Sequence, residues 1–322
     1  MEKVVTVILI LSLCFMPVQI QAKSVTSGTD GNGNKWTYNT STKTLTFTGN
    51  KAISDFAMNG HDREPSWYRW SNKTEHIVIE EGITGIGSEA FAGFVKVLSV
   101  NIPYTVKKIK RSSFENNYRL REIQIPNEVI SIGDKAFAGC YGLKNLSLPS
   151  KLNYVGSFEF CRNIKSISLP DSIKDTADGM FTGCEMMTSV KLPRKLKSIK
   201  SYDFADCRKL TKLNIPVTVK VVYMSAFAGS GLKKIVLPSN VQKIRNGNDG
   251  QKVFEYIKGI GYPTQNLRVI EIHSKKVKSI QKNSFSGLSS KVVIKVPKSK
   301  KKKYTKMLRK SGLSKKVKIC NL

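Results

Sequence analysis

Apolar and polar positions recur along this chain of 322 residues with a period of 21 to 23. A proline ends a short apolar stretch in seven successive repeats, at Pro103, Pro126, Pro149, Pro170, Pro193, Pro216 and Pro238. A phenylalanine usually follows eleven residues later, at Phe114, Phe137, Phe181, Phe204 and Phe227, whereas Phe158 comes two residues early. A repeat of this length is typical of a solenoid, because each unit can bury its apolar face only against its neighbours.

One repeat, residues 120–142, shows how a single coil is built. The alternation of Ile123 and Ile125 predicts a short strand that points both side chains inward. Pro126 cannot donate a hydrogen bond to a ladder, so it ends that strand. A second short extended segment follows, and then Phe137 enters the core. Stacked coils of this kind predict parallel β-sheet along the sides of a rod.

The repeat pattern divides the chain into four parts. We expect a signal peptide at 1–22, a β-rich N-terminal cap at 23–76, a solenoid at 77–297 and a basic C-terminal cap at 298–322. The solenoid has about nine phenylalanine-bearing coils if Phe254 belongs to an irregular eighth coil, and an insertion interrupts it at 245–266.

Both ends of a solenoid expose apolar core and need caps. At the N-terminal side, the stretch KWTYNTSTKTLTFTG alternates like a hairpin, and Trp67, Tyr68 and Trp70 offer aromatic bulk to cover the first coil. At the C-terminal side, Ser299 is a suitable N-cap and Gly312 a suitable residue just beyond the end of a short helix.

The first residues have the pattern of an export signal. Lys3 precedes an apolar run from Val4 to Phe15, and the small residue Ala22 provides a cleavage site. The run is too short to span a membrane. Lipidation at Cys14 is the alternative, although the bulky Leu13 before it disfavours that modification.

The net charge is +31, which predicts attraction to anionic polymers without selecting a fold. Residues 291–322 hold thirteen Lys or Arg and no Asp or Glu. Two basic columns follow the repeat, and with the lysine run of the tail they form the candidate polyanion-binding surface: Arg121, Lys144 and Lys165; Lys174, Lys197 and Lys220; Lys300, Lys301, Lys302 and Lys303. The alternative interpretation is a solvated basic face.

Four cysteines also follow the repeat, each three residues after its phenylalanine: Cys140, Cys161, Cys184 and Cys207. Side chains stacked in one column have poor geometry for disulfides, and the number of cysteines after the predicted cleavage is odd. The pattern therefore favours a ladder of buried thiols, with Cys320 as a separate free thiol.

Candidate catalytic or metal-binding residues are sparse. The three histidines, His61, His76 and His273, are not spaced as ligands, and no nucleophile elbow or carboxylate pair stands out. The insertion is rich in Asn-Gly and Asp-Gly but lacks the spaced carboxylates of a calcium loop. We therefore expect no enzyme, no metal and no cofactor.

The coil resembles that of the BspA-like, or Treponema pallidum-type, leucine-rich repeats, which read roughly LxxIxLPxxLxxIGxxAFxxC. Residues 77–297 carry this resemblance, and the preceding segment TKTLTFTGN and the element Pro65–Tyr68 are similar to what precedes the repeats in secreted bacterial members. The resemblance implies a right-handed leucine-rich-repeat coil with short parallel β-strands. It also implies export to the cell surface and adhesion-type binding of macromolecules without catalysis.

Three functional hypotheses follow. The first is a secreted or surface-associated protein that binds a protein or glycan, such as host matrix. The second is a cell-envelope structural protein held to anionic wall polymer or glycan by its basic face. The third, an extracellular nucleic-acid binder, is disfavoured. Binding to a polyanion weakens steeply with salt, whereas protein recognition depends more on buried anchors.

The N-terminal pattern makes a prediction about export. N-terminal sequencing of the secreted protein is expected to begin at or near Lys23, because cleavage follows the small residue Ala22. An intact Met1 in the mature protein, or a lipid on Cys14, would contradict it.

Overall fold

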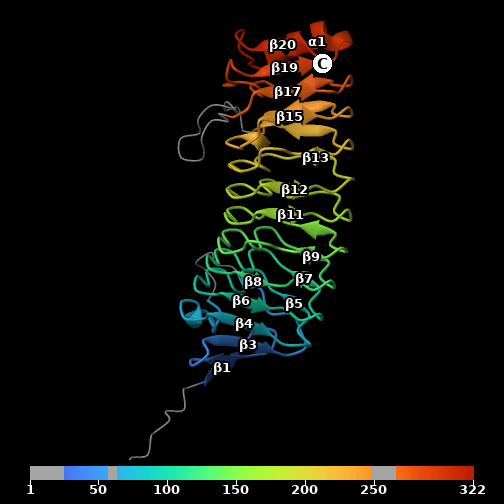
Figure 1. Cartoon of the computed structure of the whole chain (residues 1–322). Coiled ribbons are helices and arrows are strands. Elements are labelled where there is room, and N and C mark those ends of the chain that lie inside the picture. Colours follow the sequence, from blue (N-terminus) through green and yellow to red (C-terminus); the bar gives the residue numbers. More distant parts are fainter. Residues whose placement is uncertain (1–24, 57–63, 248–265) are drawn as a thin grey trace, which may run out of the picture.

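The computed structural model describes residues 25–56, 64–247 and 266–322, and it shows a parallel β-solenoid of about ten coils. The coils stack in one direction from an N-terminal hairpin, blue in Figure 1, to a C-terminal helix, red in the same view. The solenoid and its helical cap agree with the sequence prediction. The predicted signal peptide, Phe254 and most of the predicted insertion lie outside the described residues.

Each coil has two faces, separated by its proline or, in the coils of β4 and β17, by Glu80 or Ser274 at the corresponding place. The strands before the proline form what we call the long-strand face: β4 (His76–Ile79), β6 (Ser99–Asn101), β8 (Glu122–Ile123), β11 (Ser166–Ser168), β12 (Ser189–Lys191), β15 (Lys234–Leu237), β17 (Val269–Ile272) and β19 (Val293–Val296). The strands after it form the short-strand face: β5 (Gly85–Ile86), β7 (Lys108–Ile109), β9 (Ser131–Ile132), β10 (Tyr154–Val155), β13 (Ser198–Ile199), β14 (Val221–Tyr223), β16 (Lys243–Arg245) and β18 (Ser279–Ile280).

Paired strands on both faces are parallel and keep their register from coil to coil. Ser166 pairs with Ser189, for example, and Val221 pairs with Lys243. The ladder of the long-strand face is not continuous, because the coil after β8 contributes only an isolated bridge from Asn145 to Ser166. A second interruption separates β12 from β15. The predicted strands are therefore present in most coils, but the coils of Asn145 and Leu213 lack an assigned strand before their proline.

The core is a column of stacked phenylalanine rings. Consecutive ring centroids are 5.5 to 6.4 Å apart along Phe91, Phe114, Phe137, Phe158, Phe181, Phe204 and Phe227. Phe158 stays in the column although it comes two residues early, because its coil has a shorter turn and the ring remains buried. The prediction of one buried column is confirmed.

A second column contains the four repeat cysteines, all buried and all free thiols. Each Sγ donates to a backbone carbonyl of the preceding coil; the Cys161 Sγ lies 3.1 Å from the carbonyl oxygen of Phe137. Burial raises the pKa of the Cys161 thiol to about 12 and that of Cys140 well above its usual value. The thiol ladder predicted from the spacing is confirmed, and Cys320 is a free, half-buried thiol.

The N-terminal hairpin continues the long-strand face beyond the first coil. Strands β1 (Val25–Thr29), β2 (Lys35–Asn39) and β3 (Thr44–Thr48) are antiparallel, and β3 then pairs with β4 in parallel. The hairpin thus covers the open edge of β4 and ends the parallel sheet with antiparallel strands. Trp67 covers the first coil: it is fully buried, stacks edge-on against Phe47 at 5.0 Å and donates its Nε1 proton to the carbonyl of Ala90. This confirms the aromatic cap, whose short helix η1 spans Tyr68–Trp70.

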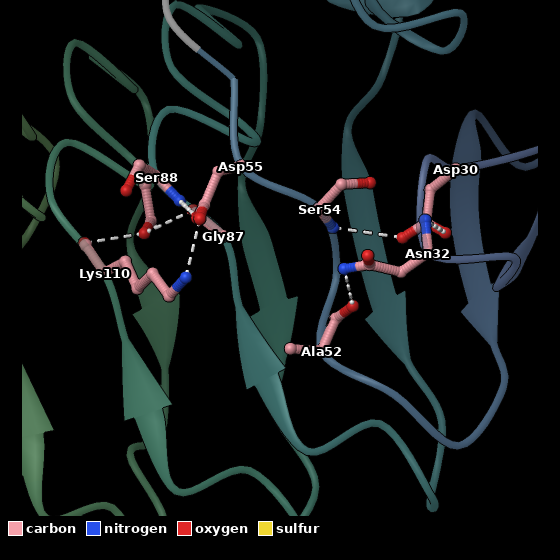
Figure 2. Close-up of polar contacts among 9 residues, drawn as sticks. Asp30, Asn32, Ala52, Ser54, Asp55, Gly87, Ser88 and Lys110 are labelled. Atoms are coloured by element: carbon pink, nitrogen blue, oxygen red, sulfur yellow. Dashed lines mark hydrogen bonds and ion pairs between the residues drawn. The ribbon is translucent and has the colours of Figure 1, made fainter.

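The short-strand face is capped by the segment that follows β3. The backbone N–H of Ile53 donates to the Gly85 carbonyl, at 2.9 Å, so this segment takes the place of a missing strand. Asp55 accepts a hydrogen bond from the backbone of Ser88 and pairs with Lys110, each at 2.7 Å, as Figure 2 shows. Gly87 is required here, because a Cβ at this position would lie only 2.0 Å from the Ser54 carbonyl oxygen.

The C-terminal cap consists of η3 (Lys298–Lys300), the helix α1 (Lys301–Lys310) and β20 (Lys318–Asn321), which pairs with β19. The predicted N-cap at Ser299 is wrong: that residue lies inside η3, and α1 begins after Lys300 without a side-chain cap. The predicted role of Gly312 is confirmed by its φ of 91°, the left-handed geometry that glycine adopts beyond a helix end. A further short helix, η2, spans Met224–Phe227.

The phenylalanine column predicts a large loss of stability on truncation. Phe181→Ala is expected to lower the free energy of unfolding by about 3–5 kcal/mol, because it leaves a cavity between two stacked rings. A urea melt measures this, with Val217→Ala as control, since Val217 is 63% exposed. The control should change by no more than about 0.5 kcal/mol. A loss below about 1 kcal/mol for Phe181→Ala contradicts the buried column.

The thiol ladder makes a separate prediction. In the native mature protein only Cys320 should react with a thiol reagent, because burial keeps Cys140, Cys161, Cys184 and Cys207 protonated and covered. All five should react after unfolding in urea. Mass spectrometry of the labelled protein counts the modified thiols. Rapid labelling of a repeat cysteine in the native state, or internal disulfides under non-reducing conditions, would show that the ladder is wrong.

Candidate binding surface

A shallow recess lies in the middle of the long-strand face, with a volume of about 420 Å³. It spans three coils, and its lining consists of Asn145, Leu146, Ser147, Ser166, Ile167, Ser168, Ser189, Val190 and Lys191. Neighbouring coils are joined here by the Asn145–Ser166 bridge and by the β11–β12 ladder. The recess therefore rests on paired backbone.

Strand alternation explains why the lining is polar. Ile167 points inward and is buried, whereas Ser166 and Ser168 on either side of it point outward. Serines at outward positions leave room where longer side chains would fill the surface. Their hydroxyl groups make no hydrogen bond to any other residue that the structure describes. Each hydroxyl can donate one hydrogen bond and accept others, so the recess offers unused groups to a ligand.

The first basic column borders this recess. Lys144 and Lys165 directly precede the recess residues Asn145 and Ser166, and both are exposed. Their coils are adjacent, because the backbone N–H of Lys165 donates to the Lys144 carbonyl at 3.2 Å. Arg121, also exposed, belongs to the coil of β8. The structure thus brings Lys144 and Lys165 together beside the recess.

The second basic column belongs to the other face. Lys197 and Lys220 directly precede β13 and β14, and the Lys220 N–H donates to the Lys197 carbonyl at 2.8 Å. Lys174 lies on the preceding coil, in a stretch without assigned strand. All three are exposed. The two columns flank different sheets, so they do not form one site.

The lysines of the tail occupy the start of α1. Lys301, Lys302 and Lys303 are exposed in its first turn, and Lys300 is half-buried before it. The first turn holds no acidic residue, although the positive end of the helix dipole favours acids there. On the inner side, the Tyr304 hydroxyl donates to the Ser274 carbonyl and accepts from the Val277 N–H, both at 3.0 Å. The helix is thus anchored inward and presents its cations outward.

The coil geometry has a counterpart in sequence. The family model for the BspA type leucine rich repeat region matches residues 64–184, 156–260 and 255–321, with six copies. This chain belongs to the BspA-type leucine-rich-repeat family. The resemblance inferred from the proline and phenylalanine spacing is confirmed.

Solved structures of bacterial leucine-rich-repeat proteins share this fold. One from Bacteroides ovatus is 24% identical, with 89% of this chain and 77% of that chain covered and a TM-score of 0.54. One from Eubacterium ventriosum is 18% identical, with 85% and 84% covered and a TM-score of 0.55. At such identities the likeness shows the fold alone. The search of curated proteins found no significant match.

An acidic residue that the sequence analysis did not single out lies on the long-strand face of this BspA-type solenoid. Glu271 is 8% exposed; it bonds His273 and Lys234, at 3.0 and 2.9 Å, and Lys295 lies 3.4 Å away. The hydrogen bond from His273 and the charge of Lys234 hold the pKa of Glu271 at about 2, despite its partial burial. Lys234 and Lys295 therefore already have an acidic partner in Glu271.

The sequence analysis also missed the recess serines. Their signal was present in the outward positions of LSLP (146–149) and SISLP (166–170), where two coils in succession carry small hydroxyl residues. Of the residues around the recess, the sequence prediction named only Lys144 and Lys165, on the basis of their charge. Among the residues described, no three His, Cys, Asp or Glu side chains gather as metal ligands, and no helix combines the length and apolar character of a membrane span.

Proposed function

We propose that this BspA-type protein is a secreted or cell-surface-associated binding protein, without catalytic activity, that holds a macromolecular ligand on its long-strand face. The recess between Asn145 and Lys191 is the observation that carries the proposal. It combines unused hydroxyl groups with neighbouring cations on backbone that is paired between coils. Such preorganised groups lose little conformational freedom when a ligand binds.

The recess chemistry supports binding over catalysis. A serine nucleophile is activated by an adjacent base. The lining includes no His, Asp or Glu, and Lys191 is exposed, whereas a lysine that acts as a base is desolvated. His76 and His273 are engaged elsewhere, with Ser99 and Glu271. The export pattern at the N-terminus supports an extracellular location.

A second candidate function is a structural role in the cell envelope, with the cap held to anionic wall polymer or glycan. The exposed lysines at the start of α1 favour it. In residues 266–322 the only acidic side chain is Glu271, which is already paired with cations. The C-terminal end therefore presents almost unopposed positive charge.

Substitutions at the recess and at the cap test the two functions. Ser166→Trp fills the recess from an outward position, and Lys144→Gln with Lys165→Gln removes its neighbouring charge. Both should weaken binding to immobilised collagen or to another matrix protein in a panel by about tenfold or more, the cost of losing one central contact. Lys197→Gln with Lys220→Gln is the matched control, with the same change of charge on the other face. If Ser166→Trp binds every probe as the parent does, the recess is not the site.

The cap is tested by changing Lys300, Lys301, Lys302 and Lys303 to Gln. If the cap holds an anionic polymer, this variant should bind heparin and isolated cell wall more weakly and with a shallower dependence on salt, because fewer counterions are released. The recess variants should leave that binding unchanged. Equal binding by the parent and the Gln variant at every salt concentration would exclude the structural role of the cap.

A further inference from the structure

One turn of the solenoid breaks a rule that the other described coils obey. In these coils the second residue after the repeat phenylalanine has a positive φ, in the left-handed region. Seven coils place Gly, Asn or Asp there, the residues that tolerate this geometry: Gly93, Asn116, Gly139, Gly183, Asp206, Gly229 and Gly287. The coil with the shortened turn instead places Phe160 there, at a φ of 57°. An aromatic residue with this backbone is strained, and strain of this kind clusters at functional sites.

The strain does not serve the core. The Phe160 side chain is 42% exposed, outside the stacked column. Its ring lies on the backbone of Gly183 in the next coil, because a Cβ on Gly183 would be only 2.6 Å from the ring carbon Cδ1. Glycine at 183 thus makes room for the ring. One side of Phe160 rests on backbone, and the rest is open to solvent.

Other apolar side chains gather on the neighbouring coils. Met186 is 41% exposed, and its N–H donates to the Arg162 carbonyl at 3.0 Å, which places it one coil beyond Phe160. Tyr118, 40% exposed, stacks on Tyr141 with centroids 4.9 Å apart. We call these four residues, Tyr118, Tyr141, Phe160 and Met186, the aromatic shelf. Tyr118 and Tyr141 are in direct contact, whereas Phe160 and Met186 are placed near one another only by their neighbouring coils. Isolated exposed apolar residues are ordinary, but several on consecutive coils favour an interaction surface.

Short stretches of chain connect the shelf residues to the recess residues. Tyr141 precedes Asn145 by four residues, Phe160 precedes Ser166 by six, and Met186 precedes Ser189 by three. Lys144 and Lys165 lie between the shelf and the recess. The coils of Lys144 and Lys165 therefore carry a shelf residue, a basic residue and recess residues in that order, and the next coil carries Met186 and Ser189 without a basic residue between them.

The charges around the shelf define the partner. Exposed basic residues border it at Arg119, Arg121, Lys144, Lys165 and Lys209. Of the acidic residues near it, Glu185 already lies between Arg162 and Arg208, at 3.6 and 3.7 Å, and Glu159, which directly precedes Phe160, is half-buried. We propose that the aromatic shelf docks an acidic protein segment, one of whose apolar side chains packs on Phe160 and Met186 while its carboxylates face Lys144 and Lys165. A linear anionic glycan fits the charge but brings no apolar side chain for the ring. This inference rests on the proposed function and specifies its ligand as a protein.

Selection from a random peptide library displayed on phage tests the proposal. Peptides that bind the mature parent protein are expected to carry an aromatic or aliphatic residue flanked by Asp and Glu. Phe160→Gly and Met186→Gln should each weaken binding of the selected peptides by about tenfold, the usual effect of losing an apolar anchor. Val217→Ser is the matched control, since Val217 is an exposed apolar residue that follows the proline of its coil, outside the shelf, and should leave binding unchanged.

Thermal melting separates binding from structure. Phe160→Gly should melt at the same temperature as the parent or higher, because glycine adopts the left-handed backbone without strain. A lower melting temperature together with unchanged peptide binding would make the ring a structural contact and overturn the proposal. So would selected peptides indifferent to both variants, a selection that enriches nothing, or self-association abolished by Phe160→Gly. Loss of matrix binding in Ser166→Trp with none in Phe160→Gly would reject the shelf and keep the proposed function.

Discussion

Stacking of one coil on the next is the constraint on which the whole structure depends. No coil has an apolar core of its own, so each interior phenylalanine ring of the column is buried between the rings of the coils above and below it. The cysteine column depends on stacking in the same way, since each thiol donates a hydrogen bond to a carbonyl of the preceding coil. This requirement fixes the register of both sheets. It also explains how Phe158 keeps its place: its coil shortens the turn and leaves the column intact.

A structure built by stacking must be closed at both ends. The N-terminal end uses an antiparallel hairpin for one face and a single extended segment, tied down by Asp55, for the other, as Figures 1 and 2 show. The C-terminal end uses β20 and the helix α1, anchored through Tyr304. Both caps leave polar or basic outer surfaces, so the apolar column ends without an exposed edge. The interior coils are thereby left free to vary outward residues without loss of core.

Function is proposed where the outward residues depart from the repeat. The recess arises because consecutive coils place Ser166, Ser168 and Ser189 at outward strand positions. The aromatic shelf includes Phe160, which one coil places in a backbone conformation that other coils give to Gly, Asn or Asp. Lys144 and Lys165 lie between them. A regular scaffold thus concentrates its irregular residues on a few neighbouring coils, and repeat proteins commonly present a ligand surface built from several repeats.

The sequence by itself determined the fold, because the spacing of Pro126, Phe137 and Cys140 recurs in successive coils, and a periodic pattern of buried residues allows few arrangements. It also determined the aromatic cap at Trp67 and the state of the repeat thiols. The start of α1 was misplaced at Ser299, because the choice between the turn η3 and an N-cap depends on packing against the last coil. Only the tertiary structure decided which basic residues meet, since Lys165 and Lys174 are close in sequence but border different sheets. The recess and the shelf depended on it as well, because each is made of side chains from several coils whose contacts exist only after stacking.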